Sequence, residues 1–562
     1  MTTDNYWLRA ASSRLNRRKF VGGAAFAGLG AASMALVGCG GGNNSGSKIA
    51  ADATSTPAAT QAPQTVKKGG SYVTAFTGPF QGVDPHGSVY GGSGILPMVY
   101  NYLFRTEVAP DAAAAKGIQY DLASSYKLES DKITYTFQLR NDVKVAANKN
   151  GVPERVIDSS DVKANWDRIS DPKVGAIAYS QFHRWVDKYD TPDKQTVRLI
   201  MKKPYAYTEA VLGSNLRGSI VPQEWLANAN LKKDTVGGGP LTLTQLTENQ
   251  IAQLDKNPTY YRQDRPYIDS YVIKSFADQT TYRTAFQSRQ IDVYGPTNHD
   301  ENLQLKQADN TLQSFSDPSL GFVSWWMNTR MKPWDDPRVR RAVNLATNRK
   351  EYIDIIGHGV GEPIAVLTYA FKEALSADEV AKIQPFDVAQ AKQLFAQAGV
   401  TQFNFQYPTS ANAADYMNIF VRQMQAAGVT ATPQPLDAGT WVTQYVQNKL
   451  SAHIALNQTY STPDVAIGWH HTNGIYGNNT YDTGFSDPAV DAAIDTAAGT
   501  LDPAARLKAY QDAQRLVQSK DPAVIHFYGV RSEAVVYPYV MNFPAGLGSL
   551  GTAFINDVWL NK

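Results

Sequence analysis

The side chains of this chain that are best suited to metal or acid–base chemistry are eight scattered histidines. They show no H-E-x-x-H or comparable spacing that would place two imidazoles on one metal ion. His470 and His471 are adjacent, and neighbours on a strand point to opposite faces, so they cannot both face one site. We therefore assign no metal role to the set, which is His86, His183, His299, His358, His453, His470, His471 and His526.

The glycine-rich run Gly357-His358-Gly359-Val360-Gly361 imitates a nucleotide-binding loop. A dinucleotide site needs a strand before such a loop, whereas a helix pattern precedes it here, so we interpret the run as the turn after that helix. The sequence contains no G-x-S-x-G nucleophile elbow and no G-x-x-x-x-G-K-[ST] loop. Nothing in these patterns indicates an enzyme or a cofactor, and a hydrolase is disfavoured.

Cys39 is the single cysteine, and it ends the run Leu36-Val37-Gly38-Cys39. A basic region and an apolar, glycine-rich stretch from Val21 to Val37 precede it. This order resembles the signal peptide of an exported bacterial lipoprotein, in which the leader is cut before the cysteine and the thiol carries lipid. The resemblance implies a signal peptide over residues 1–38. An uncleaved transmembrane anchor is the alternative, but the stretch is near the lower limit of about 17 residues for a spanning helix.

Arg17 and Arg18 lie in the run Asn16 to Val21, which resembles a twin-arginine export motif. That resemblance implies export of the folded chain, and secretion of the unfolded chain stays open as the alternative.

Residues 39–68 are mostly Gly, Asn, Ser, Ala, Thr and Pro, so they cannot bury enough apolar surface to order themselves. We expect this segment to be a disordered tether that joins a lipid anchor to an extracytoplasmic body.

The charge balance excludes one class of partner. The chain carries 53 basic and 51 acidic residues, but the leader holds five of the basic and one of the acidic residues, which leaves a mature net charge of −2. Because the mature chain has no run of lysine or arginine, we expect no nucleic-acid partner. With its only cysteine assigned to lipid, the body must be stabilised by core burial without disulfides.

Strand and helix patterns alternate irregularly along the body. Ile133 to Leu139 and Thr196 to Met201 alternate apolar and polar residues, which predicts strands with one buried face. Asp336-Pro337 is typical of a helix start, and the pattern predicts a helix to about Ile356. The residues expected to face the core from this helix are Val339, Ala342, Val343, Ala346 and Tyr352.

Two further helices are predicted from their ends. Asp387 with Gln390 has the pattern of a capping box, and Gly399 should stop that helix. Asp502-Pro503 opens another helix, whose stripe of apolar residues is most simply a core face.

The body also contains short runs in a characteristic order. They are Gly69 to Val73, Val83 to His86, Leu122 to Tyr126, Tyr135 to Val143, Ser160 to Lys163, Gly239-Pro240, Asn257 to Tyr261, Gln290 to Asp292, Met327-Asn328 and Pro333 to Lys350. In this order they resemble the family 5 extracytoplasmic solute-binding proteins, the dipeptide- and oligopeptide-binding components of ABC importers. Asp336 to Ala346 is similar to the most recognisable helix of that family, and the resemblance covers essentially the whole body.

The resemblance implies an α/β, periplasmic-binding-protein-like fold with two lobes, two crossing segments and a cleft between the lobes. By that analogy residues 69–110, 200–298 and 536–562 form the first lobe, 111–199 an inserted subdomain, and 299–535 the second lobe. A chain that crosses twice forms a hinge, and a ligand that contacts both lobes favours the closed state.

The implied partners are a small-molecule or peptide ligand and the permease and ATPase of an ABC importer. We expect a monomer.

The resemblance also indicates where the ligand binds, namely the loop around Phe80 and the second-lobe segment from Asn457 to Asp464. In the peptide-binding members a carboxylate in this segment pairs with the α-ammonium of the peptide, and Thr459 occupies that position here. A hydroxyl carries no charge, and a buried ammonium without a partner is costly, so the departure puts free peptides in doubt. Asp464 aligns with a different acidic position and is interpreted as a turn residue.

Aromatic residues near this segment are a second signal. Trp325, Trp326, Tyr460, Trp469 and Tyr476 fall in or near the expected cleft, and most aromatics of this kind are core residues. Aromatic faces suit an uncharged, partly apolar ligand such as an oligosaccharide or a blocked peptide. The predicted ligand contacts are Phe80, Trp325, Asn457, Thr459, Tyr460 and Trp469.

The predicted function is a membrane-anchored, extracytoplasmic receptor that delivers peptides to an ABC importer by hinge closure. An oligosaccharide or another uncharged solute is the alternative ligand, favoured by Thr459 and the aromatics. A surface signalling or chaperone-like binder that shares the fold is the alternative from another class. Genes for two permeases and two ATPases beside this one would favour the importer.

Replacement of Cys39 by alanine is expected to block cleavage and lipidation, because the thiol is the lipid acceptor. Metabolic labelling with a radioactive fatty acid should mark the wild-type chain and leave the Cys39→Ala variant unlabelled. A wild-type chain that carries no label would overturn the assignment of the anchor.

Overall fold

The computed structural model describes residues 65–562 apart from 79, 81, 88–93, 108–116, 175, 177, 214–217, 410–412, 461, 473–481 and 545–554. The side chains of residues 106, 107, 117, 118, 438, 442, 446 and 457–459 also lie outside the description. Several expectations therefore lie outside the described residues. They are those for the leader, Arg17, Arg18, Cys39, the tether to residue 64, and Tyr476. Among the described residues, no helix combines the length and the apolar character that crossing a bilayer requires.

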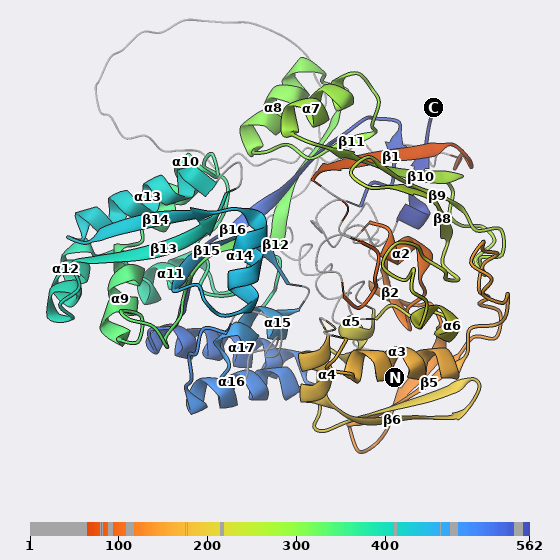
Figure 1. Cartoon of the computed structure of the whole chain (residues 1–562), viewed down its shortest axis with the longest axis horizontal. Coiled ribbons are helices and arrows are strands. Elements are labelled where there is room, and N and C mark those ends of the chain that lie inside the picture. Colours follow the sequence, from red (N-terminus) through yellow and green to blue (C-terminus); the bar gives the residue numbers. More distant parts are fainter. Residues whose placement is uncertain are drawn as a thin grey trace, which may run out of the picture.

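Two α/β lobes lie side by side, joined by long strands that pass between them (Figure 1). One lobe contains a four-stranded sheet in the order β1-β10-β9-β8, in which β1 and β10 run parallel and the other pairs antiparallel. Its elements are β1 (Ser71–Thr77), α2 (Leu96–Val99), β2 (Phe104–Glu107), β3 (Gly117–Tyr120), α5 (Thr208–Leu212), α6 (Gln223–Leu226), β8 (Leu241–Thr247), β9 (Ile251–Lys256), β10 (Ser270–Phe276), α7 (Gln279–Gln287) and α8 (His299–Ala308). Two predicted bounds differ from this grouping: β3 pairs with β2 although we expected the inserted subdomain from residue 111, and Leu305 of α8 packs with Phe286 although we expected the second lobe from residue 299.

A second, antiparallel sheet in the order β4-β5-β7-β6 lies below this lobe in Figure 1 and is covered by α3 and α4. We call this part the inserted subdomain. Its elements are β4 (Ala123–Leu128), β5 (Thr134–Leu139), α3 (Ser159–Ser170), α4 (Tyr179–Trp185), β6 (Val186–Asp193) and β7 (Thr196–Met201). The two alternating sequence patterns form β5 and β7, and Tyr135, Phe137 and Leu139 bury one face of β5, as predicted.

The other lobe is built on a six-stranded sheet in the order β11-β16-β12-β15-β13-β14. Its strands are β11 (Val293–Tyr294), β12 (Gln313–Met327), β13 (Gln402–Pro408), β14 (Thr430–Leu436), β15 (Ala452–Thr459) and β16 (Val524–Val536). Its helices are α9 (Pro337–Ala346), α10 (Arg349–Ile355), α11 (Ala377–Ile383), α12 (Val388–Gln397), α13 (Ala413–Ala426), α14 (Ala438–Val446), α15 (Pro463–Ile467), the 3₁₀ turn η2 (Gly468–His470), α16 (Pro488–Gly499) and α17 (Pro503–Ser519). The chain returns to the first lobe in β17 (Val540–Met541), η4 (Ile555–Asp557) and β18 (Trp559–Leu560).

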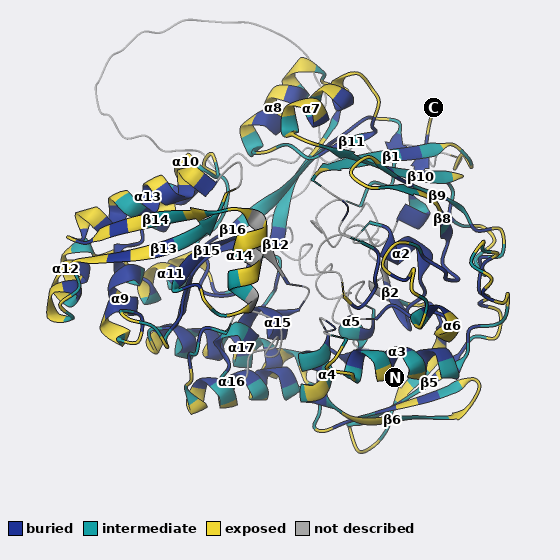
Figure 2. Cartoon of the chain, viewed as in Figure 1, coloured by how far each residue is buried: buried dark blue, intermediate teal, exposed yellow. Residues whose placement is uncertain are grey.

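The long strands β12 and β16 form the connection between the lobes. They pair antiparallel from Gln313 opposite Val536 to Trp326 opposite Val524, with register shifts after Pro318 and after Val323. The part of β12 before Leu320 is half-buried, whereas the part inside the second lobe is fully buried (Figure 2). The half-buried part is therefore the stretch of β12 with the fewest packing contacts to resist bending.

The predicted helix from Pro337 to Ile356 is two helices, α9 and α10, so the expected length was wrong. Thr347 leaves the helical conformation, and its hydroxyl donates to the carbonyl of Val343 at 2.7 Å. Asn348 then caps α10 by accepting a hydrogen bond from the N–H of Glu351. Short polar side chains compete with the helix for nearby backbone groups, which explains the break. The predicted core-facing residues of both helices are buried.

The predicted ends of α12 are confirmed in part. Asp387 accepts a hydrogen bond from the N–H of Gln390 at 2.9 Å, and Gly399 follows the helix with a φ of 69°. The backbone N–H of Asp387 donates to the carbonyl of Leu345 at 2.9 Å instead of closing a capping box. α12 is thereby tied to the end of α9.

A buried ion pair joins the first lobe to the inserted subdomain. Arg105 of β2 contacts Asp121, the residue between β3 and β4, at 2.8 Å, and both side chains are almost fully buried. The guanidinium also donates to the carbonyls of Pro97 and Tyr100, each at 2.9 Å. Asp121 accepts a hydrogen bond from the N–H of Tyr102 at 2.8 Å. Both charges are therefore compensated inside the protein.

The variant Asp121→Asn should lower the free energy of unfolding by about 3–5 kcal/mol, because it leaves the guanidinium of Arg105 buried without its counter-charge. Urea denaturation measures this loss. The matched control is Asp190→Asn, which breaks a half-exposed pair with Arg198 and should cost at most about 1 kcal/mol. Equal losses in the two variants would show that the buried pair has no special role.

Candidate ligand-binding site

The first-lobe side of the candidate site is the loop that follows β1. Phe80 is 6% exposed and meets Phe76 of β1 edge-on, with ring centroids 5.1 Å apart. The N–H of Val83 donates to the carbonyl of Lys232 at 3.2 Å, which ties the loop to a distant part of the same lobe. Phe80 and Val83 are therefore packed against the rest of the lobe.

The same loop is anchored to the inserted subdomain by a second ion pair. Both terminal nitrogens of Arg168, on α3, donate to the carboxylate of Asp84 at 3.0 and 2.8 Å. Burial would raise the pKa of Asp84, but the hydrogen bonds from Arg168 outweigh it and hold the pKa below its ordinary value. Sequence analysis did not find Arg168, because its partner is 84 residues away and no spacing rule links them.

His86 completes this anchor. The backbone N–H of His86 donates to the carboxylate of Asp84 at 3.0 Å, and the ring nitrogen Nδ1 lies 2.8 Å from the guanidinium of Arg168. Burial and the nearby charge of Arg168 lower the pKa of His86 to about 4, so the ring is neutral and Nδ1 accepts the hydrogen bond. The run Val83 to His86, which helped to reveal the family resemblance, thus holds the loop in place.

The second-lobe side of the candidate site is the end of β15. Thr459 pairs with Gly321 and Gln458 with Phe322 in the middle of β12, close to its register shift. The side chains of Asn457 and Thr459 lie outside the described ones, so their predicted contacts stay predictions. The backbone places residues 457–459 at the point where the strand leaves the sheet.

A row of aromatic rings continues from this strand end. Tyr460 is buried and lies 5.4 Å from the ring of Phe322 and 6.0 Å from that of Trp469. Trp469 is partly exposed and meets Trp326 at 4.7 Å. These rings pack against one another beside residues 457–459, and Trp469 is the member of the row that is partly exposed.

Trp325 is a correction to the predicted site. Its side chain is 0% exposed and stacks on Phe420 of α13 with a centroid distance of 4.0 Å. Trp325 and Trp326 are neighbours on β12, so they point to opposite faces of the sheet. The face of Trp325 is covered by α9 and α13, which makes it a core residue and removes it from the ligand surface.

Asp464 is also not the simple turn residue that we expected. It lies in the first turn of α15, is 1% exposed, and accepts a hydrogen bond from the hydroxyl of Tyr205 at 2.6 Å. Gln181 of α4 approaches the same oxygen at 3.5 Å. The carboxylate nearest to Thr459 in sequence is thus engaged by the opposite side of the molecule.

The adjacent histidines have separate surroundings. His470 lies 3.4 Å from His526 in the core, whereas His471 lies 3.7 Å from each of Asp491 and Asp495. Burial lowers the pKa of His470 to about 3, which keeps it neutral. Across the described part of the chain, no group of three or more His, Cys, Asp or Glu side chains is arranged to hold a metal ion.

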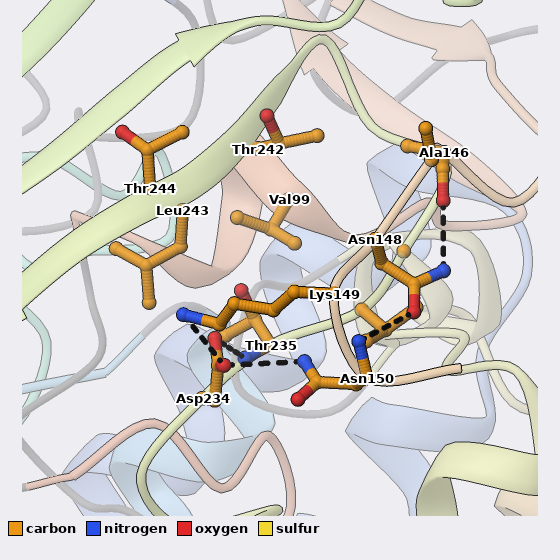
Figure 3. A pocket seen from close by; sticks show the side chains of 13 residues that line it. Val99, Ala146, Asn148, Lys149, Asn150, Asp234, Thr235, Thr242, Leu243 and Thr244 are labelled. Carbon is orange, nitrogen blue, oxygen red and sulfur yellow. Dashed lines mark hydrogen bonds and ion pairs between the residues drawn. The ribbon is translucent and has the colours of Figure 1, made fainter. Parts of the chain in front are cut away.

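A separate cavity of about 230 Å³ lies on the first-lobe side (Figure 3). It is lined by Val99, by the loop 146–150 and by residues 234–237 and 242–244. Lys149 and Asn150 both contact the carboxylate of Asp234 at its edge. No second-lobe residue lines it. A ligand there would contact one side of the hinge only and could not favour closure.

The comparisons with known proteins agree with this architecture. The family described as bacterial extracellular solute-binding proteins, family 5 Middle, matches residues 117–478. The glutathione-binding protein GsiB of Escherichia coli K12 is 25% identical over 417 residues, which cover 71% of this chain and 78% of GsiB.

Solved structures show the same fold. DppA from Helicobacter pylori in complex with the peptide STSA superimposes with a TM-score of 0.74 and 20% identity, covering 88% of this chain and 99% of that one. AgaA from A. tumefaciens R10, in complex with agropinic acid, gives a TM-score of 0.75 and 21% identity, covering 87% and 99%. The chain belongs to the bacterial extracellular solute-binding proteins of family 5, which are substrate-binding receptors of ABC importers and not enzymes.

Proposed function

We propose that this protein is a lipid-anchored, monomeric receptor that captures a peptide between its lobes and delivers it to an ABC importer. The observation that carries the proposal is the position of the two candidate segments. The loop around Phe80 and the strand end before Tyr460 come from different lobes, and both residues belong to one buried apolar cluster. A solute held between them contacts both sides of the β12–β16 hinge and thereby stabilises the closed state.

The known relatives support a peptide or peptide-like ligand. GsiB is named for glutathione, and the DppA and AgaA structures hold a tetrapeptide and agropinic acid. These ligands differ in charge and shape, so the family alone does not select among them. An N-blocked peptide or an oligosaccharide is the second candidate for this chain, favoured by Thr459 and by the ring row of Phe322, Tyr460 and Trp469.

The direct test is mass spectrometry of the solute that co-purifies with the protein from its native host. A peptide would support the leading proposal, and an oligosaccharide would support the second. Transport must then be tested separately, with the importer encoded nearest to this gene reconstituted in vesicles. A receptor that binds solute but never stimulates the ATPase of that importer would favour the signalling or chaperone-like alternative.

Specificity for the α-amino group provides a sharper prediction. If Thr459 occupies the position of the ammonium-binding carboxylate, free tetrapeptides should bind about ten- to a hundredfold more weakly to the wild type than to Thr459→Asp, because a charge-assisted hydrogen bond contributes about 1.5–3 kcal/mol. N-acetylated tetrapeptides should not gain from the substitution. Calorimetry with matched free and acetylated peptides measures both affinities.

The control is Gln393→Asp, which adds the same charge at an exposed position in the middle of α12, outside the candidate site. It should leave the preference between free and acetylated peptides unchanged. Tight binding of free peptide by the wild type, with no gain in Thr459→Asp, would show that the aligned position is wrong.

A further inference from the structure

The lobes meet a second time, away from the β12–β16 hinge. Here α4 and the segment 203–207, which leads from the inserted subdomain back to the first lobe, contact α15, α16 and α17 of the second lobe. In Figure 1 this contact lies at the lower edge of the molecule, opposite the hinge strands. The two lobes are thus held together at both ends.

The centre of this contact is the hydrogen bond between Tyr205 and Asp464. The two residues are 259 positions apart, both are buried, and the oxygen–oxygen distance is 2.6 Å. Burial, together with the charge of Asp464, raises the pKa of the Tyr205 hydroxyl well above its ordinary value, so the hydroxyl is the donor and the carboxylate the acceptor. A hydrogen bond to a charged group in a buried position is among the stronger ones in proteins.

Tyr205 is fixed by groups on its own side of the contact. Its ring stacks on Trp185 of α4 with a centroid distance of 4.3 Å and an angle of 19°. Its carbonyl accepts hydrogen bonds from the hydroxyls of Thr208 at 3.1 Å and Tyr135 at 3.3 Å. The hydroxyl is therefore held in position before the second lobe arrives, which lowers the entropic cost of making the contact.

Further polar contacts surround this centre. Asp495 of α16 pairs with Lys203 at 2.6 Å and also with Arg184. Burial would raise the pKa of Asp495, but the hydrogen bonds from these two cations hold it below its ordinary value. The N–H of Ala206 donates to the carbonyl of Ala498, at the end of α16, at 2.9 Å.

We propose that Tyr205 is a positioning residue for solute capture: its hydrogen bond to Asp464 latches the inserted subdomain to the second lobe and stabilises the closed state without touching the ligand. This inference rests on the proposed function, in which closure encloses the solute. A contact that exists in one of two states shifts their ratio by its own free energy. The latch therefore biases the chain toward closure before solute arrives.

The test is single-molecule energy transfer on the ligand-free chain. In a Cys39→Ala background, dyes are placed on cysteines that replace the exposed Lys127 of β4 and Lys508 of α17, on opposite sides of the latch. The parent should show a large closed population. Tyr205→Phe should lower the closed-to-open ratio by about ten- to a hundredfold, the range for a hydrogen bond to a charged group.

A double-mutant cycle separates the latch from a general structural effect. Asp464→Asn should lower the ratio in a similar way, and Tyr205→Phe combined with Asp464→Asn should lower it by less than the product of the two single effects, because the residues act through one contact. The matched control is Tyr189→Phe, which removes a hydroxyl-to-Asp167 hydrogen bond of 2.8 Å inside the inserted subdomain and should leave the ratio unchanged.

Two outcomes would overturn the proposal: an unchanged ratio in Tyr205→Phe, or single effects that multiply fully in the double variant. If Tyr205→Phe fails to fold, Asp495→Asn serves instead, because Asp495 is partly exposed and supports the same contact through Lys203. A ratio that does not fall in Asp495→Asn then counts against the latch.

None of these measurements needs a ligand, so failure to bind any solute would overturn the proposed function and leave the latch standing.

Discussion

The pairing of β12 with β16 is the constraint on which the rest of the molecule depends. These strands form the centre of the second-lobe sheet and also the passage to the first lobe, so one hydrogen-bonded ladder fixes both the core and the hinge. Inside the second lobe the strands are fully buried and cannot bend without loss of packing. If the lobes close on a solute as proposed, we therefore expect bending in the less buried stretch from Gln313 to Pro318.

The alternation of side chains along β12 separates two buried layers. Val323, Trp325 and Met327 point to the face covered by α9 and α13 and form the core of the second lobe. Phe322 and Trp326 point to the other face, where they meet Tyr460 and Trp469. Two adjacent tryptophans thus belong to different layers because a strand has a period of two residues.

Several buried charged groups of this protein have a charged or hydrogen-bonding partner, and each of the contacts discussed here connects parts of the chain that would otherwise be independent. Arg105 with Asp121 joins the first lobe to the inserted subdomain, and Asp84 with Arg168 anchors the loop that carries Phe80. Asp464 with Tyr205 joins the two lobes. A charge taken out of water needs a partner, so each of these contacts also specifies one relative placement of the elements that supply it.

Local patterns in the sequence determined much of the secondary structure and the family. Capping residues such as Asp387 and Asp502 act within a few positions of themselves, so their effect can be read without a fold. The ordered runs from Gly69 onward resemble one known family, and this resemblance implied two lobes and a solute receptor. The break between α9 and α10 was missed since a single polar pair decides it.

Only the tertiary structure decided which of the candidate side chains are buried in the core. Trp325 proved to be a core residue, because its face of β12 is covered by helices that lie far away in the sequence. Arg168, Tyr205 and Gln181 have no motif of their own, and their partners lie 84 to 283 positions away. Contacts of that range depend on how the lobes and the inserted subdomain are assembled, which no local periodicity contains.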